Sequence, residues 1–157
     1  MPATEPVRER ILDHVADTLR GITRENGYRH SIIRVVRESD TPGNTEGQFP
    51  LAIVLDPTED YLPLTADLWQ ARMTYTIELW MQSGGKSHST TLSQIIADVI
   101  LAMTGTQAAY RRGGIAAETK PINSVSYPSA DVQAISVAHI SFETLYRFRR
   151  TDPTAEL

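Results

Sequence analysis

Apolar residues recur at helical spacing in two segments of the chain. In residues 6–26 they form one continuous stripe, which predicts an amphipathic helix that runs past Gly21 and ends at a Gly27 cap. A second stripe occupies residues 92–103 and stops before Gly105, so it predicts another helix with the same kind of end. Each stripe covers only part of the helix surface, so each helix should bury one face.

Strand patterns fill most of the remaining sequence. Runs of β-branched residues and alternating apolar positions predict strands at residues 31–37, 49–55, 70–82, 119–127 and 133–150. A polar loop over residues 39–47, expected to be mobile, should join the first two strands as an antiparallel hairpin, and residues 56–60 should form a turn after them. The resulting order, α-β-β-β-α-β-β, predicts an α+β fold with a mostly antiparallel sheet and two helices packed on one face.

The last predicted strand is long for the size of the protein. A chain of 157 residues fits a single domain (1–157), with residues 151–157 expected to be a flexible tail. At ~3.3 Å per residue, a strand over residues 133–150 spans roughly 55 Å, whereas a compact domain of this size is roughly 40 Å across. Either the strand overhangs its own domain and offers an edge to a neighbour, or a bulge bends it back over the sheet.

Charge is unevenly distributed along the chain. The net charge of −4 argues against a general nucleic-acid binder, because such proteins are usually basic. Residues 38–71 contain acidic side chains and no Lys or Arg, whereas basic side chains outnumber acidic ones in residues 111–150. Two interpretations stay open: two differently solvated faces, or faces of opposite sign that meet head to tail between copies.

Motifs for catalysis and cofactor binding are incomplete. Residues 84–87 (Gly-Gly-Lys-Ser) are similar to a phosphate-binding loop, but Trp80 stands where that motif needs its first glycine, so we interpret the segment as a hinged loop. The histidines share no ligand spacing, the chain has no cysteine, and no serine lies in a Gly-x-Ser-x-Gly elbow. No apolar run reaches the ~20 residues of a membrane span. We therefore expect a soluble protein without catalytic, metal or cofactor site and without membrane contact.

Trp80 itself is a candidate contact residue. It is out of phase with the apolar face of its strand, formed by Tyr75, Ile77 and Leu79, so it should point away from the helices. A large aromatic residue on the open face of a sheet is often an interface anchor. The alternative is that residues 105–114 cover it.

Several stretches give the sequence a distinctive layout over nearly its full length. They are the helix start at 7–12 (Val-Arg-Glu-Arg-Ile-Leu), the strand at 50–56 (Pro-Leu-Ala-Ile-Val-Leu-Asp), the strand end at 75–80 (Tyr-Thr-Ile-Glu-Leu-Trp) and the closing strand at 140–149, followed by Thr151, Asp152 and Pro153. With these stretches the chain resembles the tail terminator family of long-tailed bacteriophages (tail completion, or minor tail protein U-like, proteins). Family members often have glycine where this chain has Thr151.

The resemblance implies a structural role in a virion. Proteins of this family form rings, typically hexamers, at the head-proximal end of the tail tube. The ring stops polymerisation of the major tail tube protein and offers a surface to the head–tail connector protein, while DNA passes through it without specific binding. The resemblance thus implies assembly in the host cytoplasm, a final place in the tail, and no enzymatic activity.

Charged residues are the candidate contacts in such a ring. We expect Arg147, Arg149 and Arg150 to act at a subunit or tube interface, with Asp56, Glu59 and Asp60 as partners and Trp80 as a further contact. Ordinary surface charge, worth under ~1 kcal/mol per pair, is the alternative for each. Other functions also stay open: another neck or tail component, such as a head-completion protein or tube subunit, or a small ligand-binding α+β domain.

Overall fold

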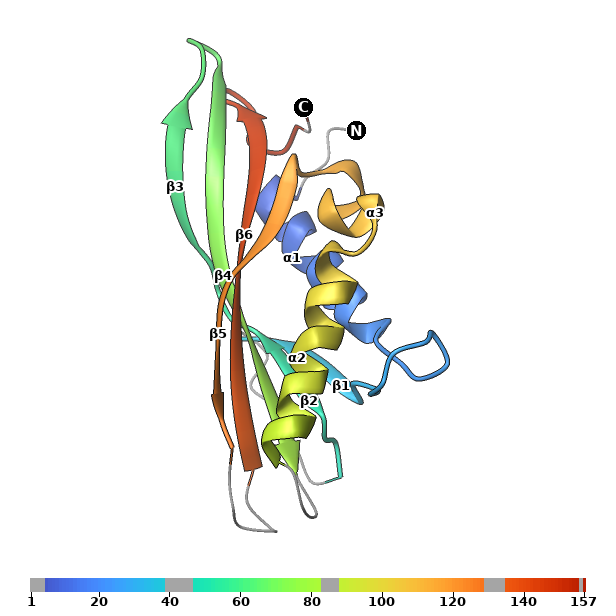
Figure 1. The fold of residues 1–157 in the computed structure, drawn as a ribbon. Coiled ribbons are helices and arrows are strands. Elements are labelled where there is room, and N and C mark those ends of the chain that lie inside the picture. The colour runs from blue at the N-terminus through green and yellow to red at the C-terminus, as the bar shows by residue number, and fades with distance from the viewer. Residues whose placement is uncertain (1–4, 39–46, 83–87, 129–134, 156) are drawn as a thin grey trace.

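The helices of the protein lie on one side of a single twisted sheet (Figure 1). The computed structural model describes residues 5–38, 47–82, 88–128, 135–155 and 157. Its elements are α1 (Val7–Arg20), β1 (Arg34–Arg37), β2 (Leu51–Val54), β3 (Thr58–Pro63), β4 (Leu68–Gln82), α2 (His88–Thr104), α3 (Gln107–Tyr110), the 3-10 turn η1 (Arg112–Gly114), β5 (Glu118–Tyr127) and β6 (Ile135–Arg149). The strand order is β1-β2-β4-β6-β5, with β3 beside β4. The predicted α+β class is confirmed.

Two strands of equal length, β4 and β6, form the axis of the sheet. Each has 15 residues, and they pair antiparallel from Leu68–Arg149 to Gln82–Ile135. At ~3.3 Å per residue each strand is roughly 50 Å long, and at the end where β4 begins and β6 finishes they reach beyond the helical layer (Figure 1). The long last strand therefore pairs with β4 along its whole length without a bulge. The part of β6 that extends past the helices is paired with an equally extended part of β4.

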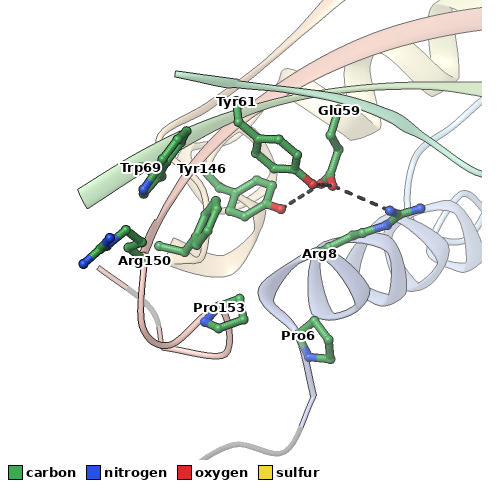
Figure 2. A pocket seen from close by; sticks show the side chains of 9 residues that line it. Pro6, Arg8, Glu59, Tyr61, Trp69, Tyr146, Arg150 and Pro153 are labelled. Atoms are coloured by element: carbon green, nitrogen blue, oxygen red, sulfur yellow. Dashed lines mark hydrogen bonds and ion pairs between the residues drawn. The ribbon is translucent and has the colours of Figure 1, made fainter. Parts of the chain in front are cut away.

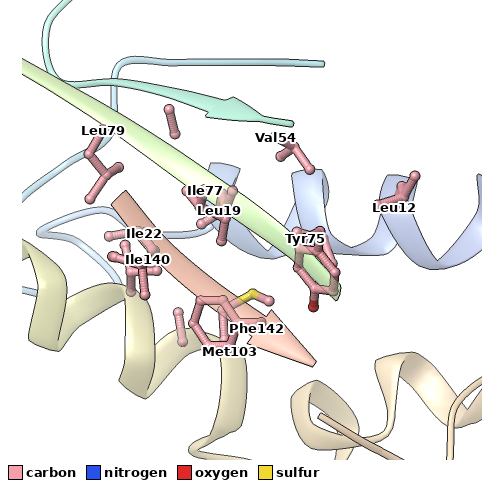
Figure 3. Close-up of a cluster of buried hydrophobic side chains, with 14 of the residues drawn as sticks. Leu12, Leu19, Ile22, Val54, Tyr75, Ile77, Leu79, Met103, Ile140 and Phe142 are labelled. Carbon is pink, nitrogen blue, oxygen red and sulfur yellow. The ribbon is translucent and has the colours of Figure 1, made fainter. Parts of the chain in front are cut away.

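The hydrophobic core lies between these two strands and helices α1 and α2 (Figure 3). Alternate side chains of β4 and β6 face the helices, and the rings of Tyr75 and Phe142 stack with centroids 6.1 Å apart. Leu12 and Leu19 reach this layer from α1 and Met103 from α2. Burial of this face is the main favourable term for folding.

Arg112 is a basic residue that the structure places inside the protein. Its side chain is fully buried, and its guanidinium donates hydrogen bonds to the Met103 carbonyl and to Thr18 Oγ1. The Met103 carbonyl belongs to the last turn of α2, where carbonyl groups lack helical partners and the helix dipole favours a cation. Burial lowers the pKa of Arg112. This residue thus belongs to the core and is not part of a basic surface.

The first helix is shorter than predicted. It ends at Arg20, and Gly21 is its C-cap, so the prediction that the helix continues to Gly27 is wrong. Glycine is a poor helix former, and Ile22 beyond it is buried in the core with its N–H bonded to the Leu19 carbonyl. The apolar stripe continued past the helix because the following segment packs on the same core.

The relation of the first two strands also differs from the prediction. β1 and β2 pair parallel, with Arg34 opposite Leu51, so they do not form an antiparallel hairpin. The connection over residues 38–50 is about as long as a parallel return requires. Most of it, residues 39–46, lies outside the described residues, as do the predicted loop at 84–87 and the turn before the last strand.

A strand stands where the sequence predicts a turn. Residues 56–60 contain turn formers, yet β3 begins at Thr58 and pairs antiparallel with the first half of β4. β2 pairs with β4 only from Ile77 to Trp80, so the first half of that β4 edge needs another partner for its backbone groups. This tertiary demand outweighs the local turn preference.

Replacing Phe142 with alanine should lower the free energy of unfolding by about 3–5 kcal/mol, because the ring is fully buried against Tyr75. Denaturant unfolding followed by circular dichroism measures the loss. The matched control is Val125→Ala on β5, where the side chain is 46% exposed, and it should change the free energy by no more than about 0.5 kcal/mol. Equal losses in the two variants would contradict this description of the core.

Candidate assembly surface

An aromatic pocket lies where the sheet extends past the N-terminal end of α1 (Figure 2). Its volume is about 500 Å³. Strands β3, β4 and β6 supply its wall, while the start of α1 and the turn after β6 supply its rim. The lining residues are Pro6, Arg8, Glu59, Tyr61, Trp69, Tyr146, Phe148, Arg150 and Pro153. We call this the aromatic pocket.

Strand alternation and one small residue create the hollow. Ala71 on β4 lies directly between Tyr61 on β3 and Tyr146 on β6, so a methyl group separates two phenol rings. Phe148 completes the wall, with its ring centroid 5.9 Å from that of Tyr61 and 5.9 Å from that of Tyr146. These side chains continue the apolar face of the core: Tyr146 is buried, Phe148 is half-buried, and Tyr61 is 53% exposed. The pocket is therefore the partly open end of the core face.

Glu59 fixes the polar side of the aromatic pocket. Its carboxylate accepts hydrogen bonds from Tyr146 Oη at 2.7 Å and from Tyr61 Oη at 2.5 Å, and Arg8 Nη1 lies 3.6 Å away. The Glu59 side chain is only 4% exposed. Burial and the hydrogen bond to Glu59 raise the pKa of Tyr146, and the same carboxylate raises the pKa of Tyr61. Glu59 is thus satisfied within its own chain and is not free for a partner.

The turn after β6 holds the rim of the pocket in place. The Val7 N–H donates to the Pro153 carbonyl at 3.2 Å, and Arg10 Nη2 donates to the Thr154 carbonyl at 2.7 Å. The segment expected to be a flexible tail thus contacts α1 through these residues. Arg150 stands on this rim, and in the part of the chain that the structure describes its side chain makes no ion pair.

The predicted contact residues fall into two groups. Glu59 is engaged in the aromatic pocket, and Arg149 Nη1 pairs with Asp67 Oδ2 at 3.2 Å. Among the described residues, no side-chain ion pair engages the other predicted charges, Asp56, Asp60, Arg147 and Arg150, all of which are exposed. The structure does not pair any predicted basic residue with a predicted acidic one inside the chain.

Trp80 lies on the sheet face opposite the helices, as its phase predicts. It packs against a small cluster formed by Val36, Leu51 and Ile53, and its indole donates a hydrogen bond to Glu78. Side chains of β1 and β2 therefore cover part of this ring, and the alternative of a cover by residues 105–114 is wrong. Trp80 is half-buried and lies away from the aromatic pocket.

Sequence reasoning missed the aromatic pocket. Its signal was present, because Tyr146 and Phe148 continue the apolar alternation of the last strand and Trp69 is in phase with Ala71. The missing information was the position of the N-terminal end of α1 on the sheet, which decides where the helical cover ends. No cluster of three or more metal-ligating side chains occurs in the described parts of the chain, and none of the helices there is long and apolar enough to cross a membrane.

The fold is also present in a virion protein. A solved structure described as "Virion of native gene transfer agent (GTA) particle" contains a chain that matches 94% of this chain and 97% of its own length, with a TM-score of 0.54 and 12% sequence identity. No protein-family model matches the sequence, and no curated protein matches it. At this identity the likeness shows a shared α+β fold.

Replacing Tyr146 with phenylalanine should make the free energy of unfolding fall less steeply at alkaline pH. The folded-state pKa of Tyr146 is raised above its ordinary value of 10.0, so its proton stabilises the fold below pH 10 and this contribution is lost as the pH rises towards the folded-state pKa. In Tyr146→Phe, the free energy of unfolding should fall less steeply above pH 10, by up to about 1.4 kcal/mol per pH unit. Denaturant unfolding between pH 8 and 11 measures this slope.

Glu59→Gln is the companion variant. It keeps the shape of the side chain and removes the charge that disfavours both tyrosinates, so it should flatten the same slope. Unchanged alkaline slopes in both variants would contradict the assignment of Glu59 as the acceptor of Tyr146.

Proposed function

We infer that the chain is a structural subunit of a phage or phage-like virion. One observation carries this proposal: the fold match to a virion chain extends over nearly the full length of both proteins. The resemblance of the sequence to tail terminators points the same way, from the helix start at 7–12 to the closing strand at 140–149. The proposed role is non-enzymatic.

The finer proposal is a ring, typically of six copies, on the head-proximal end of the tail tube. Such a ring ends polymerisation by occupying the growing end, binds the tail tube protein on one side and the head–tail connector on the other, and lets DNA pass without specific contacts. The net charge of −4 supports passage without adhesion, because phosphate is not attracted to an acidic protein overall.

Free surfaces on the sheet support assembly. In the described structure β3 pairs with β4 alone and β5 with β6 alone, so each leaves one strand edge open. Exposed apolar side chains lie on these same strands, at Tyr61 and Leu62 on β3 and at Val125 and Tyr127 on β5. Open edges with apolar neighbours are surfaces that a partner chain covers.

Purified protein should form closed rings with a central hole in negative-stain images, and light scattering should give a mass that is a fixed multiple of 17.5 kDa. Adding these rings to the polymerising tail tube protein of the same phage should shorten its tubes, because each ring blocks one growing end. Tube length is measured by electron microscopy, with heat-denatured protein as the control.

Other outcomes identify the alternatives. Open filaments of the protein alone would favour a tube subunit, because a head-to-tail contact that does not close extends without limit. A protein that stays monomeric at high concentration and leaves tube length unchanged would overturn the terminator proposal.

A further inference from the structure

The hairpin of β3 and β4 presents two unlike faces. On the inner face, Glu59 and Tyr61 belong to the aromatic pocket. Successive strand residues point to opposite sides, so Asp60 and Leu62 lie on the outer face. Leu62 is 57% exposed there, and Leu64 in the turn is 39% exposed. One face is thus a hollow with aromatic walls, and the other carries an exposed aliphatic side chain beside a carboxylate.

Local contacts hold the hairpin and the pocket rim in one arrangement. In the turn, the N–H groups of Leu64 and Thr65 donate to the Leu68 carbonyl at 2.8 and 3.1 Å. Asp67 then links this turn to the end of β6, because its carbonyl accepts from the Arg150 N–H at 2.8 Å and its carboxylate pairs with Arg149 at 3.2 Å. Both faces are therefore preformed, which limits the entropy lost on association.

The charges of the two faces are complementary and free. Asp60 lies opposite Arg72 in the register, but Arg72 Nε is 3.6 Å from Glu143, and no ion pair of Asp60 occurs among the described residues. On the pocket rim Arg150 likewise makes no ion pair within the described structure, whereas Arg8 is held by Glu59. In the part of the chain that the structure describes, the outer face thus offers a carboxylate, and the pocket rim a guanidinium, that no ion pair engages.

We propose that the outer face of the hairpin of one copy seats in the aromatic pocket of the next copy, with Leu62 against the aromatic rings and Asp60 facing Arg150. The occupant of the pocket is therefore a second copy of this chain. The inference rests on the proposed ring and names the surfaces by which its subunits meet.

The contact is heterologous, since it joins two different surfaces. Each copy that fills a neighbour's pocket keeps its own pocket free for the following copy, which is what a ring of many subunits needs. A two-fold contact would need the same neighbour to reach both surfaces of one copy, but Asp60 and Leu62 lie on the opposite side of the hairpin from the pocket residues Glu59 and Tyr61. The placement of the two faces on opposite sides therefore favours a head-to-tail order over a symmetric dimer.

Charge exchange tests the contact. Asp60→Arg and Arg150→Glu should each weaken self-association tenfold or more in sedimentation velocity, and the double variant should recover most of it because the pair is restored with reversed sign. Glu25→Arg and Arg111→Glu are matched controls at exposed positions outside both faces, and they should assemble as the unaltered protein does. Single variants that assemble normally would overturn the contact and leave the ring proposal standing.

Disulfide cross-linking tests the contact between the hairpin and the pocket independently of ring formation. The chain has no cysteine, so Asp60→Cys and Arg150→Cys variants carry one thiol each. Under oxidation, a mixture of the two should give a 60–150 cross-linked dimer, identified by tags of different length, while each variant alone should stay largely monomeric on a denaturing gel. A cross-link in the mixture without rings in solution would support the contact and count against the terminator proposal. Equal yields of 60–60 and 150–150 dimers would overturn the head-to-tail arrangement.

Discussion

The antiparallel pairing of β4 with β6 is the constraint on which the rest of the structure depends. These two strands, each of 15 residues, are longer than the helical layer that covers them. Where helices lie on them, their inner face is the core around Tyr75 and Phe142. Where the helices stop, the same face becomes the aromatic pocket. The length difference between sheet and helices thus divides one continuous apolar face into a core and an aromatic pocket.

Hydrogen bonds and ion pairs within the chain decide which surface charges remain available to partners. Glu59 is acidic and lies in a predicted contact region, yet two phenols and Arg8 engage it. Arg149 is likewise held by Asp67, and Arg112 is buried at the end of α2. Among the described residues no ion pair engages Asp60 or Arg150, although each is adjacent in sequence to an engaged residue. Asp60 differs from Glu59 because successive residues of a strand point to opposite faces.

The proposed role places unusual demands on a small fold. A subunit of a ring needs two different surfaces that match each other, and both must be rigid enough to hold one angle between copies. In the proposed contact, the hairpin of β3 and β4 supplies both surfaces, because they lie on its two opposite faces. The fold is shared with a virion chain at 12% sequence identity, so the same framework carries different side chains, and specific contacts must be read from each sequence separately.

Periodicity in the sequence determined the helices, the long alternating strands and the fold class, because burial of one face imposes a period of 3.6 or 2 residues wherever packing occurs. It also determined that Trp80 faces away from the helices. Tertiary structure alone decided that α1 stops at Gly21, that β1 and β2 run parallel, and that residues 58–60 of the predicted turn belong to a strand. The aromatic pocket belongs to this second group, because the pattern of Tyr146 and Phe148 is the same whether or not a helix covers them. The reason is physical: local sequence specifies which face is apolar, while the lengths and positions of distant elements decide what lies against that face.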